Sequence, residues 1–265
     1  MADSSIRRLY LYCTEEALLS IINEGKLKVS QPWGTNDITE GVPQCVSCRP
    51  SFVEQYGYVC FSKTCTSPAM WGYYAQRSQG AVIVFDIAGV LSSSGEGHVE
   101  LFNPNKWGRE NVNGYLPGRL VEVRYSAQRD AEGKDCFSML SLKSPTWQAE
   151  QEYRYIIPLH ECEFQGIETK NGVALGIYKT ASILQFASGI ILGPECRLKE
   201  ALIQGKLQEK EDCEHIPADI TVTRIKWSEQ DFEFIEPQEV SYIDISRKYR
   251  ETLYKKHHPS MISFN

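Results

Sequence analysis

The chain has 265 residues, of which 42% are hydrophobic and 23% are charged, and its formal net charge at pH 7 is −6. This composition is ordinary for a globular protein, and it excludes fibrous and extensively disordered chains. The net negative charge argues against a general nucleic-acid-binding face, which normally needs clustered basic residues, although a local basic patch remains open. The length lies near the upper limit for one domain, so we expect a single domain over residues 1–265.

The segments that direct a protein to a membrane or out of the cell are not found in this sequence. No apolar run approaches the ~20 residues that a membrane-spanning helix needs. Met1–Arg8 contains two arginines, but no apolar stretch of signal-peptide length follows it. We therefore expect a cytoplasmic protein without membrane contact, in which the nine cysteines are reduced.

Four of the cysteines raise the question of a zinc site. Cys45 and Cys48 form a C-x-x-C pair, and Cys60 and Cys65 follow. Tetrahedral zinc usually takes its four ligands as two tight pairs. Here the second pair is loosely spaced and Cys60 lies inside a predicted strand, so we expect no metal.

The first predicted unit is a strand, a helix and a second strand. Leu9–Tyr12 has the pattern of a short strand. Thr14 is a suitable N-cap for a helix with an apolar stripe, and Gly25 is a suitable C-cap. Leu27–Ser30 reads as the second strand. Residues 31–57 form a long loop, and long loops in compact domains are often functional.

The second predicted unit follows this loop. Tyr58–Ser62 is a strand, and Ser67 followed by proline predicts the start of a helix over 68–77. The continuous apolar run at 81–86 is typical of a strand that is buried on both faces. Residues 92–118 are predicted to form a second long loop.

The remaining elements alternate without a regular βαβ order. The predicted strands are Leu120–Tyr125, Glu150–Ile157, Gly189–Leu192 and Ile220–Trp227, and the predicted helices are Thr180–Ala187 and Leu198–Leu207. This mixture favours an α+β fold over a doubly wound parallel sheet. The chain contains no G-x-G-x-x-G after a strand and no G-x-x-x-x-G-K-[ST], so the usual phosphate-binding loops are missing.

The segment Trp147–Arg154 concentrates charged residues on a predicted strand. Because side chains alternate along a strand, Glu150, Glu152 and Arg154 would share one face. Such a row is either a solvated strand face or a pair of carboxylates with a catalytic role.

Three segments, taken in order, resemble the ADP-ribosyltransferase superfamily. They are Leu9–Thr14 with the helix after it, Tyr58–Ser62 with Ser67–Tyr74, and the E-x-E of Glu150-Gln151-Glu152. The order L-Y-x-Y, F-S with M-W-x-x-Y, and W-x-x-E-x-E-Y-R is also similar to a widespread uncharacterised bacterial family over residues 8–195. The resemblance implies a split, mostly antiparallel sheet with flanking helices, and leaves 196–265 as an extension of unknown role.

The resemblance also implies the roles of particular residues. Glu152 stands in the place of the catalytic glutamate, and Glu150 is a second acid that orients or deprotonates the nucleophile. The implied NAD-binding residues are Arg8, Tyr10, Tyr12, Ser62, Trp71 and Tyr74. A carboxylate fixed beside the ribose stabilises the positive charge that develops when the nicotinamide–ribose bond breaks. The alternative for Trp71 and Tyr74 is simple core packing.

Leu11 departs from the pattern, because the superfamily usually has His or Arg at this position. Arg7 or Arg8 could substitute for it. The implied function is transfer of ADP-ribose from NAD, without a metal, to a protein or nucleic-acid acceptor in a toxin or phage-defence context. The alternatives are a non-catalytic nucleotide-binding module and a purely structural or interaction protein. Residues 244–258 carry five Lys/Arg against two acids, which indicates either a partner-binding patch or a solvated helix.

Overall fold

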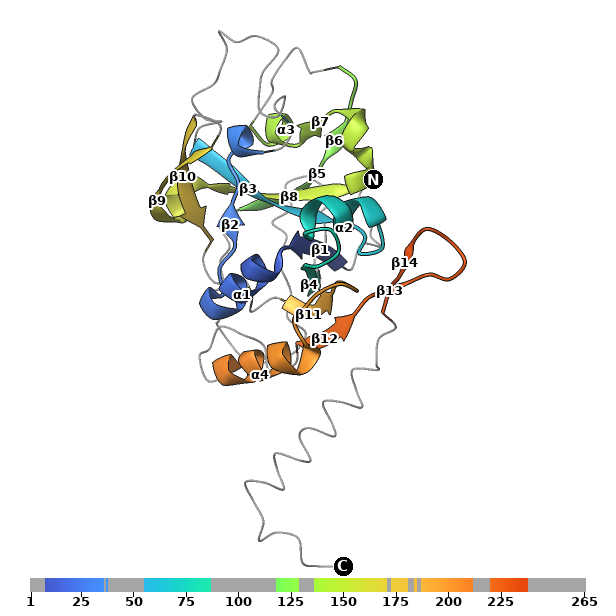
Figure 1. Cartoon of the computed structure of the whole chain (residues 1–265). Helices are drawn as coiled ribbons and strands as arrows, with labels where there is room; N and C mark the ends of the chain where they lie inside the picture. The colour runs from blue at the N-terminus through green and yellow to red at the C-terminus, as the bar shows by residue number, and fades with distance from the viewer. Residues whose placement is uncertain are drawn as a thin grey trace, which may run out of the picture.

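The described part of the chain folds around one large β-sheet (Figure 1). The computed structural model describes residues 8–35, 37, 55–86, 118–128, 136–170, 173–180, 184, 187–211 and 220–237. The long loops predicted at 31–57 and 92–118, and the basic segment 244–258, lie mostly or wholly outside these residues.

The central sheet has seven strands in the order β12-β11-β4-β1-β3-β8-β5. In that order their bounds are Thr221–Arg224, Ala187–Leu192, Ala81–Asp86, Arg8–Cys13, Tyr56–Ser62, Glu152–Pro158 and Arg119–Glu122. Every neighbouring pair is antiparallel except β11 and β12, which are parallel. The prediction of a mixed α+β protein with a mostly antiparallel sheet is confirmed.

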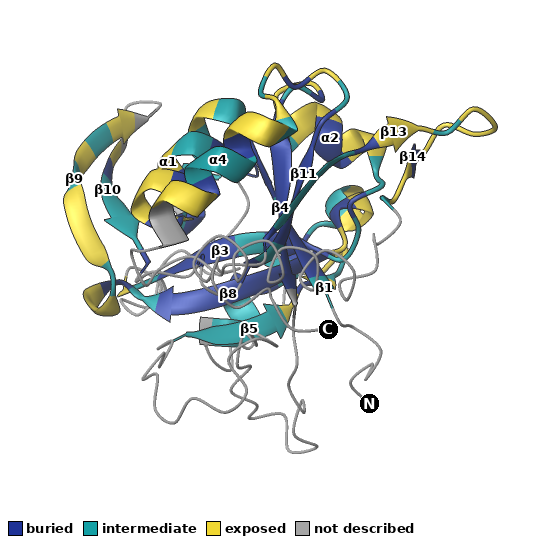
Figure 2. Cartoon of the chain, turned by 90° about the horizontal axis from the view of Figure 1, so that it is seen from below, coloured by how far each residue is buried: buried dark blue, intermediate teal, exposed yellow. Residues whose placement is uncertain are grey.

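This sheet consists of two well-paired halves that meet at one residue pair. Strand β1 pairs with β4 along its whole length, from Arg8↔Asp86 to Cys13↔Ala81. With β3 it pairs only at Tyr10↔Ser62. Figure 2 shows β4 and β11 running steeply across the direction of β3, β8 and β5. Beyond this single bridge β1 and β3 have no further paired residues, and we call the region between the two strands the wedge.

Helices α1 (Glu15–Glu24) and α4 (Glu200–Glu211) cover one face of the sheet (Figures 1 and 2). The prediction for α1 is confirmed at both ends: the Thr14 hydroxyl accepts from the amide of Ala17 at 3.1 Å, and Gly25 has a left-handed φ of 70°. The apolar side chains of both helices join the main core, which also contains Leu9, Phe61, Phe85, Tyr153 and Tyr155.

Helix α2 (Pro68–Tyr74) covers the opposite face over β1 and β4. Ser67 caps it as predicted, but the helix ends three residues before Arg77. Gln76, Arg77 and Ser78 have φ of 50°, 56° and 68°, which a right-handed helix cannot contain. The short helix α3 (Cys136–Leu140) covers β3 and β8 on this same face.

Shorter elements complete the described structure. They are β2 (Lys28–Val29), η1 (Pro32–Gly34), β6 (Arg124–Tyr125), β7 (Leu142–Lys143), η5 (Pro145–Glu150), η6 (Leu159–Glu161), β9 (Glu163–Lys170), β10 (Val173–Lys179), β13 (Lys226–Trp227) and β14 (Phe234–Ile235). Strands β2, β10 and β9 form a second sheet, and β13 pairs with β14. None of the helices in these described ranges is long and apolar enough to cross a membrane.

Three further predicted elements need correction. The strand expected at 120–125 is divided at Val123 into β5 and β6, which belong to different sheets. The strand expected at 220–227 is likewise divided at Ile225 into β12 and β13, which belong to different sheets. The helix expected at Thr180–Ala187 is wrong at its end, because Ala187 begins the buried strand β11. Most of its interior lies outside the described residues.

A pair of glycines tests the packing of this fold. A Cβ on Gly80 would lie 2.1 Å from the Cys13 carbonyl oxygen, whereas a Cβ on Gly205 in α4 would meet nothing within 4 Å. We predict that Gly80→Ala lowers the free energy of unfolding by about 1–3 kcal/mol or more, because 1–3 kcal/mol is the usual cost of overpacking. The same change at Gly205 should raise it by ~0.5–1 kcal/mol, because alanine favours a helix. Urea denaturation of both variants checks this, and equal effects would contradict the packing.

Candidate active site

The strand register brings three predicted site residues into one row. Ser62 on β3 lies opposite Tyr10 of β1 on one side and opposite Glu152 of β8 on the other. One pleat further, Cys60 lies opposite Arg154. Because alternate residues share a face, Tyr10, Ser62, Glu152 and Arg154 project from the same side of the sheet.

Glu150 reaches this side by a turn. The prediction that it belongs to the strand is wrong, because it is the last residue of the 3-10 helix η5. Gln151 follows with a left-handed φ of 45°, and its amide donates to the Gln148 carbonyl oxygen at 3.2 Å. The Ser62 hydroxyl donates to the Glu150 carbonyl oxygen at 2.7 Å and ties this turn to β3.

Two carboxylates and two cations form a buried cluster, which we call the ion cluster: Lys143, Glu150, Glu152 and Arg154. Arg154 donates to both oxygens of Glu152, from Nε at 2.7 Å and from Nη2 at 3.0 Å. Lys143 Nζ donates to Glu150 Oε2 at 2.5 Å and to Glu152 Oε2 at 3.1 Å. The four side chains are only 1–8% exposed, and their formal charges balance.

Neighbouring elements hold the cluster from several sides. Arg154 also donates from Nη1 to the Leu140 carbonyl oxygen at 2.6 Å, and its guanidinium carbon lies 4.3 Å from the centre of the Tyr58 ring. The Tyr74 hydroxyl of α2 donates to Glu150 Oε1. The Tyr125 hydroxyl accepts from the Glu152 amide at 2.9 Å. The interpretation of this segment as a solvated strand face is therefore wrong.

The cluster decides the charge of Glu152. Burial acts to raise the pKa of the Glu152 carboxyl, but the Arg154 guanidinium and the Lys143 ammonium outweigh it and hold that pKa below its ordinary value. Glu152 is thus a carboxylate at neutral pH. The pKa of the Tyr74 hydroxyl is raised, first by burial and then by its hydrogen bond to Glu150, so Tyr74 keeps the proton that it donates.

A cavity of about 310 Å³ opens onto the cluster at the wedge between β1 and β3. One wall carries the four charged residues and Ser62. The aromatic residues that line the cavity are Tyr10, Tyr12, Phe61, Tyr74 and Trp147, and Lys28 and Asp37 lie among its other lining residues. This volume is at the lower end of the ~300–1,000 Å³ of ligand pockets. It suits a small ligand or one end of a larger one.

The predicted NAD-binding residues fall into two groups. Tyr10, Tyr12, Ser62 and Tyr74 line the cavity, whereas Trp71 does not. Trp71 is fully buried, with its ring centre 5.4 Å from that of Tyr12 and its Nε1 donating to the Cys65 carbonyl oxygen at 2.6 Å. The sequence left core packing open as the alternative role of Trp71. The structure shows that Trp71 packs in the core.

Of the two arginines expected near Leu11, only Arg8 is described, and it does not line the cavity. Leu11 itself lines it, while Arg8 begins β1 and is not among the lining residues. Arg7 lies outside the described residues. A residue near the C-terminal end of the described chain holds Tyr10, because the Tyr10 hydroxyl donates to Glu236 Oε1 at 2.7 Å.

Sequence reasoning missed Lys143 and Asp37, and it gave Trp147 no separate role. Lys143 reaches the cluster through the two-residue strand β7 and the turn η5, for which no spacing rule exists. Trp147 offered a signal, because it lies three residues before Glu150, which places it on the same side of a helical turn. Its ring centre lies 5.0 Å from Lys143 Nζ.

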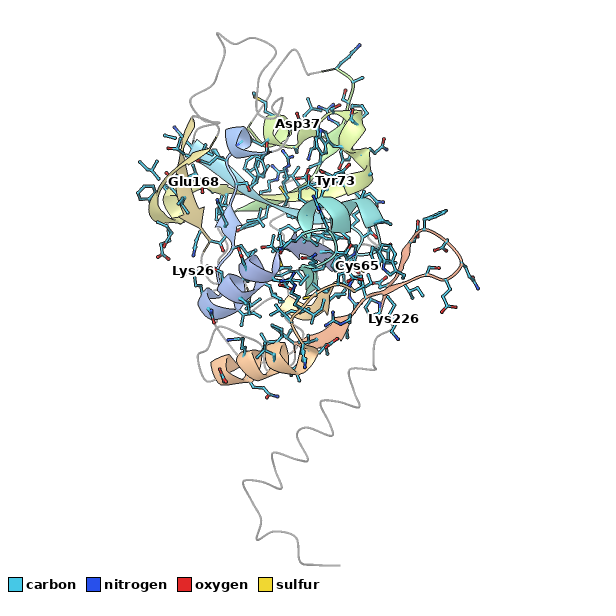
Figure 3. All side chains as sticks on the ribbon, viewed as in Figure 1. Lys26, Asp37, Cys65, Tyr73, Glu168 and Lys226 are labelled. Carbon is cyan, nitrogen blue, oxygen red and sulfur yellow. The ribbon has the colours of Figure 1, made fainter. Side chains whose placement is uncertain are left out.

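The cysteines give no sign of a metal within the described residues. There, no three His, Cys, Asp or Glu residues form a group that could hold an ion. Burial raises the pKa of the Cys65 thiol to about 12, so it remains protonated. Figure 3 labels Cys65 between α2 and the β13–β14 hairpin. Cys45 and Cys48 lie outside the described residues, and the four-cysteine prediction stays a prediction.

A comparison with protein-family models gives a match, over part of the chain that carries this site. Residues 70–155 match the family model described as "Protein of unknown function (DUF2971)". The prediction of an uncharacterised domain family is confirmed by this match. No curated protein and no solved structure matches the chain. The matched segment includes all four members of the ion cluster, and Tyr10, Tyr12 and Ser62 precede it.

The pKa of Glu152 predicts how stability depends on pH. Because the folded-state pKa is lowered, the contribution of this carboxylate is present above the ordinary value of about 4.5 and is lost as the pH falls through the folded value. We predict that Glu152→Gln lowers the free energy of unfolding by about 3–5 kcal/mol at pH 7, because it leaves buried cations undercompensated.

The difference between wild type and Glu152→Gln should stay constant above pH 5 and shrink under more acidic conditions. Denaturant titrations at pH 3–7 measure it. A difference near zero at pH 7 would show that the cluster is not the tight, buried unit described above.

Proposed function

We propose that the cavity binds the nicotinamide end of NAD and that the protein transfers ADP-ribose from NAD to a macromolecular acceptor. The observation that carries this proposal is Glu152: a buried carboxylate, held ionised by Arg154 and Lys143, that faces a cavity with aromatic walls. The resemblance of the E-x-E segment to ADP-ribosyltransferases supports the same assignment.

Cleavage of the nicotinamide–ribose bond needs such a carboxylate. When the bond between the ribose C1′ and the nicotinamide nitrogen breaks, nicotinamide leaves as a neutral molecule with the bonding electrons. The ribose then carries oxocarbenium character, as in glycoside hydrolysis. A fixed negative group beside it stabilises this charge more than it stabilises the ground state. The acceptor attacks C1′ and loses a proton. Glu150 contacts the same Lys143 ammonium as Glu152, so it lies near the ribose that Glu152 would hold and is placed to receive that proton.

The aromatic walls of the cavity suit the binding of the nicotinamide ring. The nicotinamide ring is flat and cationic, and tyrosine and tryptophan faces bind such rings by stacking and cation–π attraction worth about 1–2 kcal/mol per good contact. The Tyr74 hydroxyl donates to Glu150, the Trp147 ring lies 5.0 Å from Lys143 Nζ, and both residues line the cavity. A cavity of about 310 Å³ suits the nicotinamide and its ribose, with the rest of NAD extending out of the wedge.

The split sheet supports an ADP-ribosyltransferase-like fold as part of the same proposal. The resemblance implies a split sheet, and here the two halves pair only at Tyr10↔Ser62, two residues that line the cavity. A toxin or phage-defence context rests on the sequence resemblance alone.

Two observations favour a second candidate, a non-catalytic NAD-binding module. Both oxygens of Glu152 already accept hydrogen bonds from Arg154 or Lys143, which reduces the charge that the ribose would meet. Leu11 lines the cavity at the position where the superfamily that the chain resembles usually has His or Arg. This candidate binds NAD without releasing nicotinamide.

Both candidates predict that NAD stabilises the folded protein. A ligand that binds only the native state adds RT ln(1 + [L]/Kd), which is about 2.7 kcal/mol at a hundredfold excess over Kd. We therefore expect a rise in Tm with millimolar NAD or nicotinamide in a thermal melt. A melting temperature that responds to neither compound nor to ADP-ribose would contradict both candidates.

Only the enzyme predicts a selective loss of turnover. We expect Glu152→Gln to lower the rate of nicotinamide release by about 10²–10³, the usual effect of removing one preorganised electrostatic group, while the Kd for NAD changes little. Glu150→Gln should reduce transfer to an acceptor in cell lysate more than hydrolysis of NAD. Nicotinamide release, acceptor labelling and NAD binding are measured for each variant at a temperature below its own Tm.

The chain offers a matched control. Glu163→Gln makes the same chemical change on an exposed carboxylate that pairs with Lys26, away from the cavity, and should leave turnover unchanged. Full turnover by a folded Glu152→Gln variant would refute the catalytic role. NAD binding by a wild-type protein that releases no nicotinamide would favour the binding module.

A further inference from the structure

Lys143 stands out because it contacts both carboxylates of the cluster. Its ammonium lies 2.5 Å from Glu150 Oε2 and 3.1 Å from Glu152 Oε2, and its side chain is 6% exposed. Arg154, in contrast, directs Nε and Nη2 to the two oxygens of one acid, Glu152. Lys143 is thus the bridge between the two acids.

The charges show what this bridge does. With Lys143 and Arg154 present, the two acids are balanced by two cations. Without the lysine ammonium, two buried carboxylates would face one guanidinium, and the uncompensated negative charge would be costly in this environment. Buried carboxylates that share a site avoid that cost by sharing a proton.

We propose that Lys143 is the positioning residue of this site, because its bridge offsets the charges of Glu150 and Glu152 and fixes the two acids relative to each other. A ligand in the cavity then meets two distinct carboxylates, rather than a pair joined by one proton. The catalytic consequence of this role rests on the function proposed above, whereas the protonation of the two acids can be measured without any ligand.

The backbone around Lys143 fits a positioning role. Strand β7 is held in register with β6, where Tyr125 pairs with Lys143. The Ser144 hydroxyl then caps η5 by accepting from the Thr146 amide at 3.4 Å. The Trp147 ring lies 5.0 Å from Lys143 Nζ on the cavity side. These contacts fix the lysine close to the turn that carries Glu150.

Other titratable groups near the bridge come from all the elements packed around it. They are Tyr74 of α2, Tyr125 of β6, Cys60 of β3 and Arg154 of β8, and Lys28 and Asp37 line the same cavity. Burial is the first cause of a raised pKa at Tyr74, and burial also raises the pKa of Tyr125 to about 12. Both tyrosines therefore keep their protons throughout the pH range of the experiment.

The test compares Lys143→Met with the charge-balanced double variant Lys143→Met/Glu150→Gln. In the single variant, the carboxylates take up one proton on folding. A folded-state proton affinity above that of the unfolded chain gives stability that is present at low pH and lost as the pH rises. Relative to wild type, we expect the unfolding constant of Lys143→Met to rise by up to about tenfold per pH unit between pH 5.5 and 8.5. The double variant should follow the pH dependence of wild type.

A matched exposed pair controls for the substitutions themselves. Lys26→Met and Lys26→Met/Glu163→Gln make the same changes at a solvent-exposed ion pair, and neither should alter the pH dependence of unfolding. Urea denaturation of all variants at four pH values provides the data.

Each outcome decides the proposal. A Lys143→Met protein with the pH dependence of wild type would overturn it. If Lys143→Met fails to fold at every pH, the double variant decides: a folded double variant supports the proposal, and an unfolded one overturns it in favour of a purely structural lysine.

Turnover separates this inference from the proposed function. If wild type releases nicotinamide, Lys143→Met should recover activity as the pH rises and the shared proton is lost. If wild type releases none at any pH, the proposed function fails, while the stability data still decide the role of Lys143.

Discussion

Four charged side chains lie together in one buried cluster, and the elements around it supply the hydrogen bonds that such a cluster needs. Moving each ion out of water costs several kcal/mol, and only good geometry with additional hydrogen bonds offsets that cost. Lys143, Glu150, Glu152 and Arg154 meet this condition, because each carboxylate oxygen has a donor and α2, α3 and β6 supply further partners. Loss of one member leaves another uncompensated. The segment from α3 to β8 should therefore form as a unit, and sequence change in it is constrained by charge as well as by packing.

The sheet explains why this polar cluster borders a cavity instead of closing into the core. Strands β3 and β8 pair along their whole length, so the row from Cys60↔Arg154 to Ser62↔Glu152 is rigid. The other half of the sheet pairs with it only at Tyr10↔Ser62. The wedge lies beyond that bridge, and α2, packed over β1, brings Tyr74 to Glu150 across it. A charged wall on one half and an aromatic wall contributed largely by the other follow from this geometry.

Local signals in the sequence predicted the elements that depend on local physics. Thr14 and Gly25 bounded α1, and the apolar run from Ala81 identified the buried strand β4, because caps and apolar patterns act over a few residues. The importance of Glu152 was also accessible from its motif. Lys143 was not, since its place depends on the pairing of β7 with β6 and on the turn η5. Trp71 was assigned to the ligand from a resemblance that left core packing open, and its contacts with Tyr12 and Phe234 distinguish the two.

The most direct measurement is a crystal structure of the protein with a non-hydrolysable NAD analogue. We predict that the nicotinamide ring lies in the cavity against Tyr74 or Trp147, and that the adjoining ribose lies within hydrogen-bonding distance of Glu152. The Lys143 bridge between the two acids should persist in the complex. An analogue bound elsewhere on the protein, or a cavity that stays empty at saturating concentration, would contradict the assignment of this site to NAD.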